Sequence, residues 1–443
     1  MDMQNDKIVV GLDIGTTKIC VIVGHKNDYG KLDVLGMGKA VSDGVVKGKV
    51  INIEKTILAI KKAVEEAEDI SGIDIKVVNV GIAGHHIRSS IQRGSITRED
   101  RDEEITVEDV NRLTNDMHRM VIPAGNQIIH VMPQVYTVDY DDGIKDPVGM
   151  TGIRLEADFH VITADINSIN NIQKCVKRAG LDIENMILEP LASSLAVLSD
   201  DEKEAGVCLV DIGGGTTDIA IFHENIIRHT GVIPFGGNII TSDIKEGCMV
   251  MQQQAELLKT KFGRAISTEA SENEIGSIPG LRNRAPKEIS IKNLAHIVEA
   301  RMEEIIDLVH AEILASGYEG RLAGGIVITG GGSQMHSARQ LVEYLTGMDA
   351  RIGYPNEHLG RTKIEAVKSP MYATSVGLVL AGYRSIDERE NRYLEAKLNN
   401  QNMFINHKQK GVKGAKKEGD FFSKIINKTK SFLIDDFDEK DDY

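Results

Sequence analysis

Two glycine-rich turns constrain the fold of this chain more than any other feature. The first covers residues 11–18 (Gly-Leu-Asp-Ile-Gly-Thr-Thr-Lys) and the second covers residues 211–218 (Asp-Ile-Gly-Gly-Gly-Thr-Thr-Asp). Each turn lies between two apolar runs, which is typical of a β-hairpin whose backbone N–H groups converge on a phosphate. Because the same device occurs twice, the sequence predicts a duplicated fold that holds one polyphosphate between its halves.

Length and composition limit the classes of protein that the chain can belong to. A chain of 443 residues is too long for a single core, so we expect two or more domains. The net charge of -14 argues against a nucleic-acid partner, and an aromatic content of 4% disfavours base-stacking surfaces. The four cysteines are scattered and lie mostly in apolar runs, so we interpret them as small buried residues of a reducing cytosol: Cys20, Cys175, Cys208 and Cys248.

The N-terminal residues are polar, and no apolar stretch approaches the length of a membrane span. We therefore expect the body of the protein to lack a secretion signal and to be soluble and cytoplasmic.

Changes in residue pattern along the chain predict two α/β core subdomains, each interrupted by an insertion. The first core subdomain comprises residues 7–83, 161–203 and 366–384, and the second comprises residues 204–237 and 312–365. An α+β insertion occupies residues 84–160, and a helical insertion occupies residues 238–311.

Local signals place several elements within these subdomains. We expect a helix over residues 53–68 capped by Asn52, and a helix near residues 167–179 that ends at Gly180. Thr106 and Asp109 form a predicted capping box for a third helix. Pro133, within the strand predicted over residues 127–140, marks an edge or a bulge.

The two turns carry the residue types that bind a nucleotide polyphosphate. Glycines permit close approach of the backbone, and threonines supply hydroxyl groups: Gly15, Gly213, Gly214 and Gly215, with Thr16, Thr17, Thr216 and Thr217. Lys18 can reach a β- or γ-phosphate as a point charge. A third glycine run, residues 330–332, follows a predicted buried strand and strengthens the nucleotide interpretation. The patterns of P-loop and Rossmann sites are absent from the sequence.

Two carboxylates at the strand ends indicate a metal ion. Asp13 and Asp211 each end a predicted strand, so both side chains should face the crevice between the halves. Because two carboxylates near a polyanion repel each other, we infer Mg²⁺ held largely through water. Asp218 is an alternative group for serving the metal.

The sequence beyond residue 384 predicts a flexible linker over residues 385–418 and an amphipathic helix over residues 419–437. The residues from Lys408 to Lys430 include eight lysines against two acidic residues. Near an anionic lipid surface each lysine contributes about 1 kcal/mol. We therefore favour a membrane-binding helix over a helix packed on the protein's own core, with these apolar residues facing the lipid: Phe421, Phe422, Ile425, Ile426, Phe432 and Leu433.

The phosphate motifs together resemble those of the actin-like ATPase superfamily. The resemblance implies two duplicated α/β domains and bound ATP with Mg²⁺, with residues 13–18 and 211–218 as phosphate loops and residues 330–333 as the adenosine motif. Residues 234–237 and 255–259 are similar to segments that contact the β-phosphate and the ribose in relatives. The resemblance thus adds these candidate nucleotide-binding residues: Gly236, Gly237, Glu256, Lys259, Gly330, Gly331, Gly332 and Ser333.

Glu189, in the pair Glu189-Pro190, resembles the acidic position that lies near the attacking water in heat-shock relatives. The resemblance makes Glu189 the catalytic candidate for positioning that water. The alternative interpretation is a carboxylate at a helix start, which the helix dipole favours. We expect hydrolysis to be slow at most, with ATP acting chiefly to hold the two domains together.

Within that superfamily, the chain resembles the FtsA family of bacterial cell-division proteins. The resemblance rests on residues 81–87, the placement of the first insertion, residues 300–305 preceded by Ser290 and Leu294, and the linker followed by an amphipathic helix. It implies an ATP-binding protein that polymerises like actin and tethers the FtsZ ring to the inner face of the cytoplasmic membrane at the division site. The implied partners are the C-terminal peptide of FtsZ, further copies of the chain, other division proteins and anionic lipid.

Arg301 and Lys292 are the residues that we expect to contact a partner, although solvated helix charges would give the same pattern. Two other functions remain open from the sequence. A small-molecule kinase would need a substrate pocket and an aspartate base, and it would have no use for the C-terminal helix. A chaperone would need a β-rich peptide-binding domain, whereas the 60 residues after Tyr383 are mostly polar.

Overall fold

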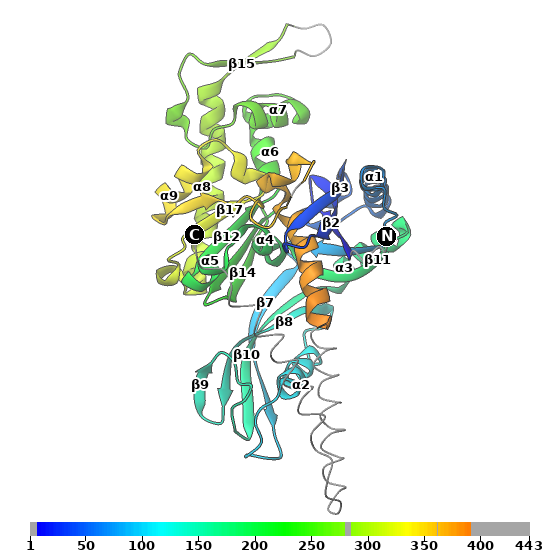
Figure 1. The fold of residues 1–443 in the computed structure, drawn as a ribbon. Coiled ribbons are helices and arrows are strands. Elements are labelled where there is room, and N and C mark those ends of the chain that lie inside the picture. Colours follow the sequence, from blue (N-terminus) through cyan, green and yellow to red (C-terminus); the bar gives the residue numbers. More distant parts are fainter. Residues whose placement is uncertain (1–6, 280–284, 361, 391–443) are drawn as a thin grey trace, which may run out of the picture. The chain divides into compact units, whose positions relative to one another are not determined.

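The computed structural model describes residues 7–279, 285–360 and 362–390 (Figure 1). The chain divides into two units, Met1–Arg384 and Ser385–Tyr443. The sheets formed by the described residues lie in the first unit. The predicted membrane-binding residues Phe421, Phe422, Ile425, Ile426, Phe432 and Leu433 lie outside the described residues, as does most of the predicted linker.

Two five-stranded sheets with the same strand arrangement form the centre of the first unit. The order is β3–β2–β1–β6–β11 in one sheet and β14–β13–β12–β17–β18 in the other. In each sheet the first three strands in this order pair antiparallel with their neighbours. The last two strands run parallel to the central strand, which is β1 in one sheet and β12 in the other. This repetition confirms the predicted duplication of an α/β fold.

The strands of the first sheet are β1 (Ile8–Ile14), β2 (Lys18–Lys26), β3 (Leu32–Val41), β6 (Val77–Ile82) and β11 (Asp182–Leu188). Those of the second sheet are β12 (Val207–Ile212), β13 (Thr217–His223), β14 (Ile226–Ile233), β17 (Ile326–Thr329) and β18 (Ala350–Ile352). The first glycine turn joins β1 to β2, and the second joins β12 to β13, as the sequence predicts. A small hairpin, β4 (Val45–Val46) and β5 (Lys49–Val50), follows β3.

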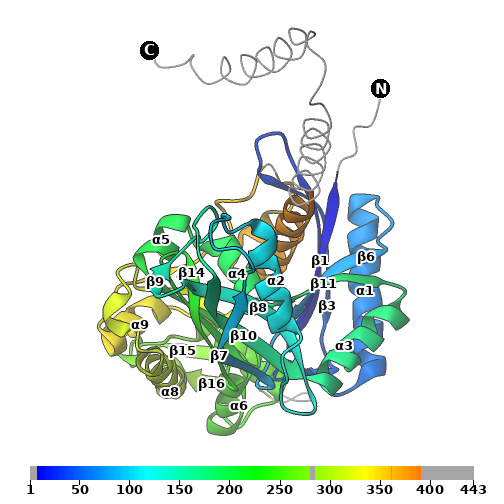
Figure 2. The same ribbon diagram turned by 90° about the horizontal axis from the view of Figure 1, so that it is seen from below.

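Helices α1 (Ile53–Ser71) and α3 (Ile166–Ala179) pack on the first sheet and share one hydrophobic core with it (Figure 2). The Asn52 side chain accepts a hydrogen bond from the Lys55 amide at 3.0 Å and so caps the N-terminus of α1. Gly72, with φ of 71°, caps the C-terminus of the same helix. Gly180, with φ of 97°, ends α3. These caps confirm the predicted start of α1 and the predicted end of α3.

The first insertion forms a separate sheet in the order β7–β10–β8–β9, covered by α2 (Val107–His118). Its strands are β7 (Ile87–Thr97), β8 (Asn126–Val138), β9 (Asp141–Ile144) and β10 (Arg154–Asp165). The predicted capping box of Thr106 and Asp109 is present, and a β-bulge lies beside Pro133. β10 continues past residue 160, where we expected the insertion to end, because it pairs along its whole length with β7 and β8.

The second insertion contains α6 (Gly237–Gly247), α7 (Gln252–Phe262), β15 (Ile275–Ile278), β16 (Lys287–Ser290) and α8 (Ile291–Ser316). Unlike the first insertion, it shares one continuous hydrophobic core with its sheet. The reason is α8, which runs past residue 311, our expected limit, and buries Ile305, Val309 and Ile313 in that core. α9 (Ala338–Thr346) packs on the same core.

Helix α4 (Glu189–Val197) precedes α5 (Asp200–Ala205), and a helix over residues 373–390 closes the described chain. Residues 385–390, the first residues of the predicted linker, are helical. The short 3₁₀ segments are Ser267–Glu269, Glu319–Arg321, Gly332–Gln334, Glu365–Lys368 and Pro370–Tyr372. Among the described residues, no helix has both the length and the apolar character needed to cross a membrane.

The free cysteines have the environments expected of small apolar residues. Cys20, Cys175 and Cys208 are buried, and Cys248 is half-buried. Burial raises the pKa of Cys175 to about 11 and that of Cys20 to about 12. These thiols therefore stay protonated at neutral pH, which agrees with a structural role.

Gly377 allows the last helix to lie directly against α4. A Cβ atom at this position would lie 1.8 Å from the Ala192 carbonyl oxygen, a backbone atom that cannot turn aside. We expect Gly377→Ala to lower the free energy of unfolding by roughly 1–3 kcal/mol, because overpacking outweighs the higher helix propensity of alanine. Chemical denaturation followed by circular dichroism measures this change.

The matched control is Gly320→Ala, where a Cβ atom would meet nothing within 4 Å. Its effect should stay within about 0.5 kcal/mol. Equal stability of the two variants would contradict the close helix contact.

Candidate functional site

The two glycine turns meet at one cavity of about 450 Å³ between the halves of the first unit. The cavity wall contains most of the nucleotide-binding residues predicted from the sequence. They are Asp13, Gly15, Thr16, Thr17, Lys18, Asp211, Gly213, Gly214, Gly215, Thr216, Asp218, Gly237, Glu256, Lys259, Gly330, Gly331 and Gly332, together with Glu189.

The turns contact each other through threonines on one side and glycines on the other. A Cβ atom on Gly214 would lie 1.9 Å from Thr17 Oγ1, and one on Gly215 would lie 2.6 Å from Thr16 Oγ1. Thr16 Oγ1 also accepts a hydrogen bond from the Gly48 amide at 3.1 Å, which fixes the β4–β5 hairpin beside the first turn. Only glycine leaves room for this contact, so the two halves are fitted to each other at the cavity.

Hydroxyl groups from two helices hold the carboxylates at the strand ends. Ser375 Oγ donates to Asp13 Oδ2 at 3.0 Å, while Ser193 Oγ and Thr374 Oγ1 donate to Asp211 Oδ2 at 2.7 and 3.1 Å. Burial raises the pKa of both carboxyl groups. Hydrogen bonds from these hydroxyls and the nearby Lys18 ammonium partly oppose that shift.

Asp218 and Glu189 add two more acidic groups to the same wall. Burial raises the pKa of Asp218 to about 7, with a further contribution from the charge of Asp211. Asp218 Oδ2 accepts from Thr216 Oγ1 at 2.9 Å, but Oδ1 is buried and has no hydrogen-bond partner. Burial and the charges of three aspartates hold the pKa of Glu189 well above its usual range. The cavity is therefore short of positive charge.

These groups fit a divalent cation that is bound together with other ligands. A cation would stabilise the ionised form of the four neighbouring carboxyl groups, whose pKa values are raised. It would also give the unpartnered Asp218 oxygen a favourable contact. Among the described residues, no three His, Cys, Asp or Glu side chains are arranged to hold a metal by themselves. A metal here would need water or phosphate oxygens to complete its coordination, as Mg²⁺ commonly does.

Lys18 connects the first turn to the start of the last helix. Its ammonium group donates to the Met371 carbonyl oxygen at 2.8 Å and lies 5.2 Å from the centre of the Tyr372 ring. Lys18 lines the cavity in this arrangement, so the ammonium group can exchange the carbonyl for an anionic ligand.

A second basic residue, Lys259, is built into the opposite wall. Its ammonium group contacts the Gly237 carbonyl oxygen at 2.9 Å, Thr241 Oγ1 at 2.8 Å and Glu256 Oε2 at 2.8 Å. This network joins α6 to α7 and places the side chains of Glu256 and Lys259 at the cavity. Both side chains thus present charged atoms to the cavity.

Three predicted residues lie behind the wall instead of lining it. Thr217 Oγ1 donates to the Phe235 carbonyl oxygen at 2.9 Å, and Ser333 Oγ donates to the Gly330 carbonyl oxygen at 2.8 Å. Gly236 packs against the second turn, where a Cβ atom would lie 2.6 Å from the Gly213 carbonyl oxygen. These residues shape the turns, and the turns face the cavity.

The candidate partner residues Arg301 and Lys292 lie away from the cavity on α8. They are nine positions apart (301 − 292), which places them on opposite sides of a helix with 3.6 residues per turn. Arg301 pairs with Asp243 at 2.6 Å and with Glu304, while Lys292 lies 3.9 Å from Glu272. One flat surface therefore cannot present both side chains.

Several cavity residues were not among the candidate ligand-binding residues of our sequence analysis, although Ala83 lies in the segment 81–87 that carries the family resemblance. They are Gly48, Ala83, Asn238, Ile240, Thr260, Lys261, Gly263, Gln334, Met335, His336, Met371 and Thr374. Most of them lie one to four positions from a predicted residue. Extending each motif by one helical turn would have found those neighbours but not Gly48, Met371 or Thr374, and the residue types alone do not indicate a ligand.

Comparisons with known proteins agree with this architecture. The family model "Cell division protein FtsA" matches residues 208–377, and the model "SHS2 domain inserted in FTSA" matches residues 84–163. The Pseudomonas aeruginosa cell division protein FtsA is 44% identical over 380 residues, which cover 86% of this chain and 90% of that protein. The Borreliella burgdorferi protein of the same name is 38% identical over 407 residues, covering 91% of this chain and 97% of that protein.

Solved structures show the same fold at low sequence identity. The "PilM-PilN type IV pilus biogenesis complex" aligns with a TM-score of 0.62 at 13% identity, covering 84% of this chain and 98% of the matched chain. The ethanolamine utilization protein EutJ from Carboxydothermus hydrogenoformans aligns with a TM-score of 0.50 at 16% identity, covering 86% and 91%. The predicted actin-like ATPase fold is confirmed.

The raised pKa of Asp218 makes stability depend on pH. Below about pH 4 the carboxyl is protonated in both the folded and the unfolded chain; between about pH 4 and 7 only the folded chain keeps the proton. Stability therefore falls as pH rises through this window, by up to about 4 kcal/mol. Asp218→Asn should remove this part of the slope when denaturant unfolding of the full chain is followed from pH 4 to 8.

The exposed Asp69 provides a matched control. Asp69→Asn should leave the pH dependence as in the unmodified protein. If Asp218→Asn gave a curve parallel to the unmodified protein, Asp218 would not be the group that titrates in this window.

Proposed function

This chain belongs to the FtsA family of cell division proteins, and from that premise we propose that it binds Mg²⁺–ATP, polymerises like actin and tethers FtsZ to the membrane. The observation that carries the nucleotide part is the convergence of both glycine turns, with Lys18 and Lys259, on one cavity. The membrane part rests on the amphipathic pattern of residues 419–437.

The two turns would hold the phosphates with backbone N–H groups and threonine hydroxyls. Gly214 and Gly215 keep the turns close, so donors from both halves act on the same ligand. Glu256 and Lys259 would contact the ribose, and residues 330–332 would line the adenosine side. Because each half supplies part of the site, nucleotide binding would hold the halves in one relative position.

Asp13 and Asp211 would hold Mg²⁺ through water, and Asp218 lines the same cavity. When bound, the cation supplies the positive charge that the four acidic groups lack. Ser193, Thr374 and Ser375 keep the Asp13 and Asp211 carboxylates oriented through hydrogen bonds. These residues thus organise the site independently of the ligand.

We further propose that Glu189 orients the attacking water during slow ATP hydrolysis. A carboxyl group accepts a hydrogen bond from water well only when it is ionised, and burial, together with its acidic neighbours, holds the pKa of Glu189 high. Glu189 would therefore become a good acceptor only when positive charge enters the cavity. This dependence makes hydrolysis conditional on a completed site.

The proposed partners follow from family membership and from the tail. The C-terminal peptide of FtsZ would bind at the second insertion, where either Arg301 or Lys292, but not both on one face of α8, would contact it. Self-association would form the polymer, and each copy would add one lipid-binding helix. Many weak anchors on one polymer bind a membrane far more tightly than a single anchor does. Other division proteins would join this peripheral assembly at the division site.

The nucleotide proposal predicts that filling the contact between the turns abolishes ATP binding. In Gly214→Val, the added side chain meets Thr17 Oγ1, because even a Cβ atom would lie 1.9 Å away. We expect Mg²⁺–ATP affinity, measured by calorimetry, to fall at least about 100-fold, a loss of roughly 2.7 kcal/mol. Gly320→Val, on an open surface, should bind ATP as the unmodified protein does.

Circular dichroism on each variant separates loss of the site from loss of the fold. If the folded, unmodified protein took up no Mg²⁺–ATP, or if folded Gly214→Val bound it normally, the nucleotide proposal would fail.

The membrane proposal predicts that deleting residues 419–443 abolishes ATP-dependent sedimentation with anionic vesicles and leaves ATP affinity unchanged. The physical reason is that this segment carries the apolar face, while the cavity residues all precede residue 375. A full-length variant with Phe422→Glu and Ile426→Glu should show the same loss, because charges on the apolar face oppose insertion. A parallel loss of ATP affinity would instead give the tail a structural role.

A further inference from the structure

The base of the first insertion lies directly against Glu189. Gly81, at the end of β6 just before the insertion, has no room for a side chain: a Cβ atom would lie 3.0 Å from Glu189 Cγ and 3.1 Å from its Oε1. Ala83, two residues later, lines the same cavity as Glu189. The strand that leads into the insertion therefore forms one wall of the space that the Glu189 side chain occupies.

A second contact comes from inside the insertion. His130, on β8, accepts a hydrogen bond at Nε2 from the backbone amide of Leu188 at 3.0 Å. Leu188 is buried, ends β11 and immediately precedes Glu189, the first residue of α4. The pairing of β8 with β10 is irregular beside His130. Ile162 pairs with His130 and Thr163 pairs with Ile128, so Ile129 is an extra residue on β8. Such bulges redirect neighbouring side chains.

The chemistry of this contact fixes the role of each atom. A backbone amide can only donate, so Nε2 of His130 must be unprotonated and the ring proton must lie on Nδ1. Burial, with a smaller effect of His118, lowers the pKa of His130 to about 4, so the ring is neutral at physiological pH. Leu188 is the N-cap residue of α4, and its side chain makes no capping hydrogen bond. Without His130, the buried backbone amide of Leu188 would lose its hydrogen-bond acceptor in this structure.

We propose that His130 is a positioning residue for Glu189, through which the first insertion sets the orientation of the carboxylate at the cavity. The proposal rests on the proposed role of Glu189 in hydrolysis. The hydrogen bond holds the Leu188 peptide at the point where β11 turns into α4. The direction of the Glu189 side chain depends on the backbone angles at that point. Gly81 confines the side chain from the other side.

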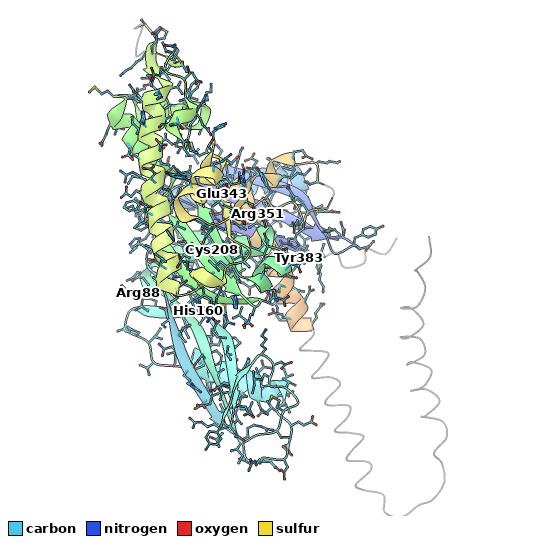
Figure 3. All side chains as sticks on the ribbon, turned by 90° about the vertical axis from the view of Figure 1, so that its left-hand side faces the viewer. Arg88, His160, Cys208, Glu343, Arg351 and Tyr383 are labelled. Carbon is cyan, nitrogen blue, oxygen red and sulfur yellow. The ribbon has the colours of Figure 1, made fainter. Side chains whose placement is uncertain are left out.

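The insertion is also attached to the second half of the molecule. Ser89 Oγ, on β7, donates to the Thr230 carbonyl oxygen on β14 at 3.2 Å, and His160 Nε2, on β10, lies 3.3 Å from Thr230 Oγ1. Figure 3 labels His160 and Arg88 where the insertion meets the second half. Because the insertion contacts both halves, their relative position would be transmitted to His130 and then to Glu189. Closure of the cavity and orientation of the carboxylate are thereby linked.

The test compares three histidine variants of the full chain. His130→Phe keeps an aromatic ring but removes the acceptor, whereas His130→Gln places an amide oxygen near the position of Nε2 and should restore it. His118→Phe, an exposed histidine of the same insertion, is the matched control. Three quantities are measured: Mg²⁺–ATP affinity by calorimetry, phosphate release at saturating ATP, and hydrogen exchange of a peptide covering residues 182–189 by mass spectrometry.

We expect His130→Phe to lower kcat roughly 10-fold to 100-fold, because a small misplacement of a catalytic group has effects of that size. ATP affinity should change less than about 2-fold, since His130 does not line the cavity. Exchange at the Leu188 amide should rise about 10-fold or more. His130→Gln should recover most of the activity and the protection, and His118→Phe should match the unmodified protein.

Gly81→Ala gives an independent check should His130→Phe fold poorly. The three atoms nearest to its Cβ all belong to the flexible Glu189 side chain, so the protein should fold and bind ATP while kcat falls. Normal kcat in both His130→Phe and Gly81→Ala, or equal loss in His130→Phe and His130→Gln, would overturn the proposal. An unmodified protein that binds ATP without hydrolysing it would also overturn this proposal alone, whereas one that binds no ATP would overturn the proposed function itself.

Discussion

The whole site depends on the close contact between the turns that end β1 and β12. Thr16 and Thr17 occupy the space that side chains at Gly214 and Gly215 would fill, so the two halves approach until their backbones share one cavity. This contact brings together residues from two separate sheets. Without it, each turn would be an ordinary hairpin end with a few polar groups exposed to water.

The same approach concentrates negative charge and creates the chemistry of the site. Four carboxyl groups with raised pKa values face one cavity, and the hydroxyls of Ser193, Thr374 and Ser375 orient two of them without neutralising any. Those hydroxyls arrive on two helices that cross at Ala192 and Gly377. The crossing therefore determines the electrostatics of the cavity as well as the packing of the halves.

Sequence motifs predicted the cavity wall well where the residue type itself is required. Glycines at 213–215 and 330–332, and the aspartates that end β1 and β12, all lie where the turns predicted them. Thr217, Gly236 and Ser333 support the turns from behind. β10 and α8 run past residues 160 and 311, the limits expected for the two insertions, because strand pairing and core packing continue beyond those positions.

Local residue patterns predicted the duplication, the two glycine turns and the starts of several elements, since close backbone approach, capping and periodicity each leave a signature in the sequence. Which distant residues meet depends instead on how the chain packs. His130 and Leu188 are 58 positions apart, and Ser375 and Asp13 are 362 apart. A hydrogen bond between such residues depends on how whole sheets and helices pack. Such a hydrogen bond imposes no periodicity or composition on the residues around either partner, so no local sequence pattern predicts it.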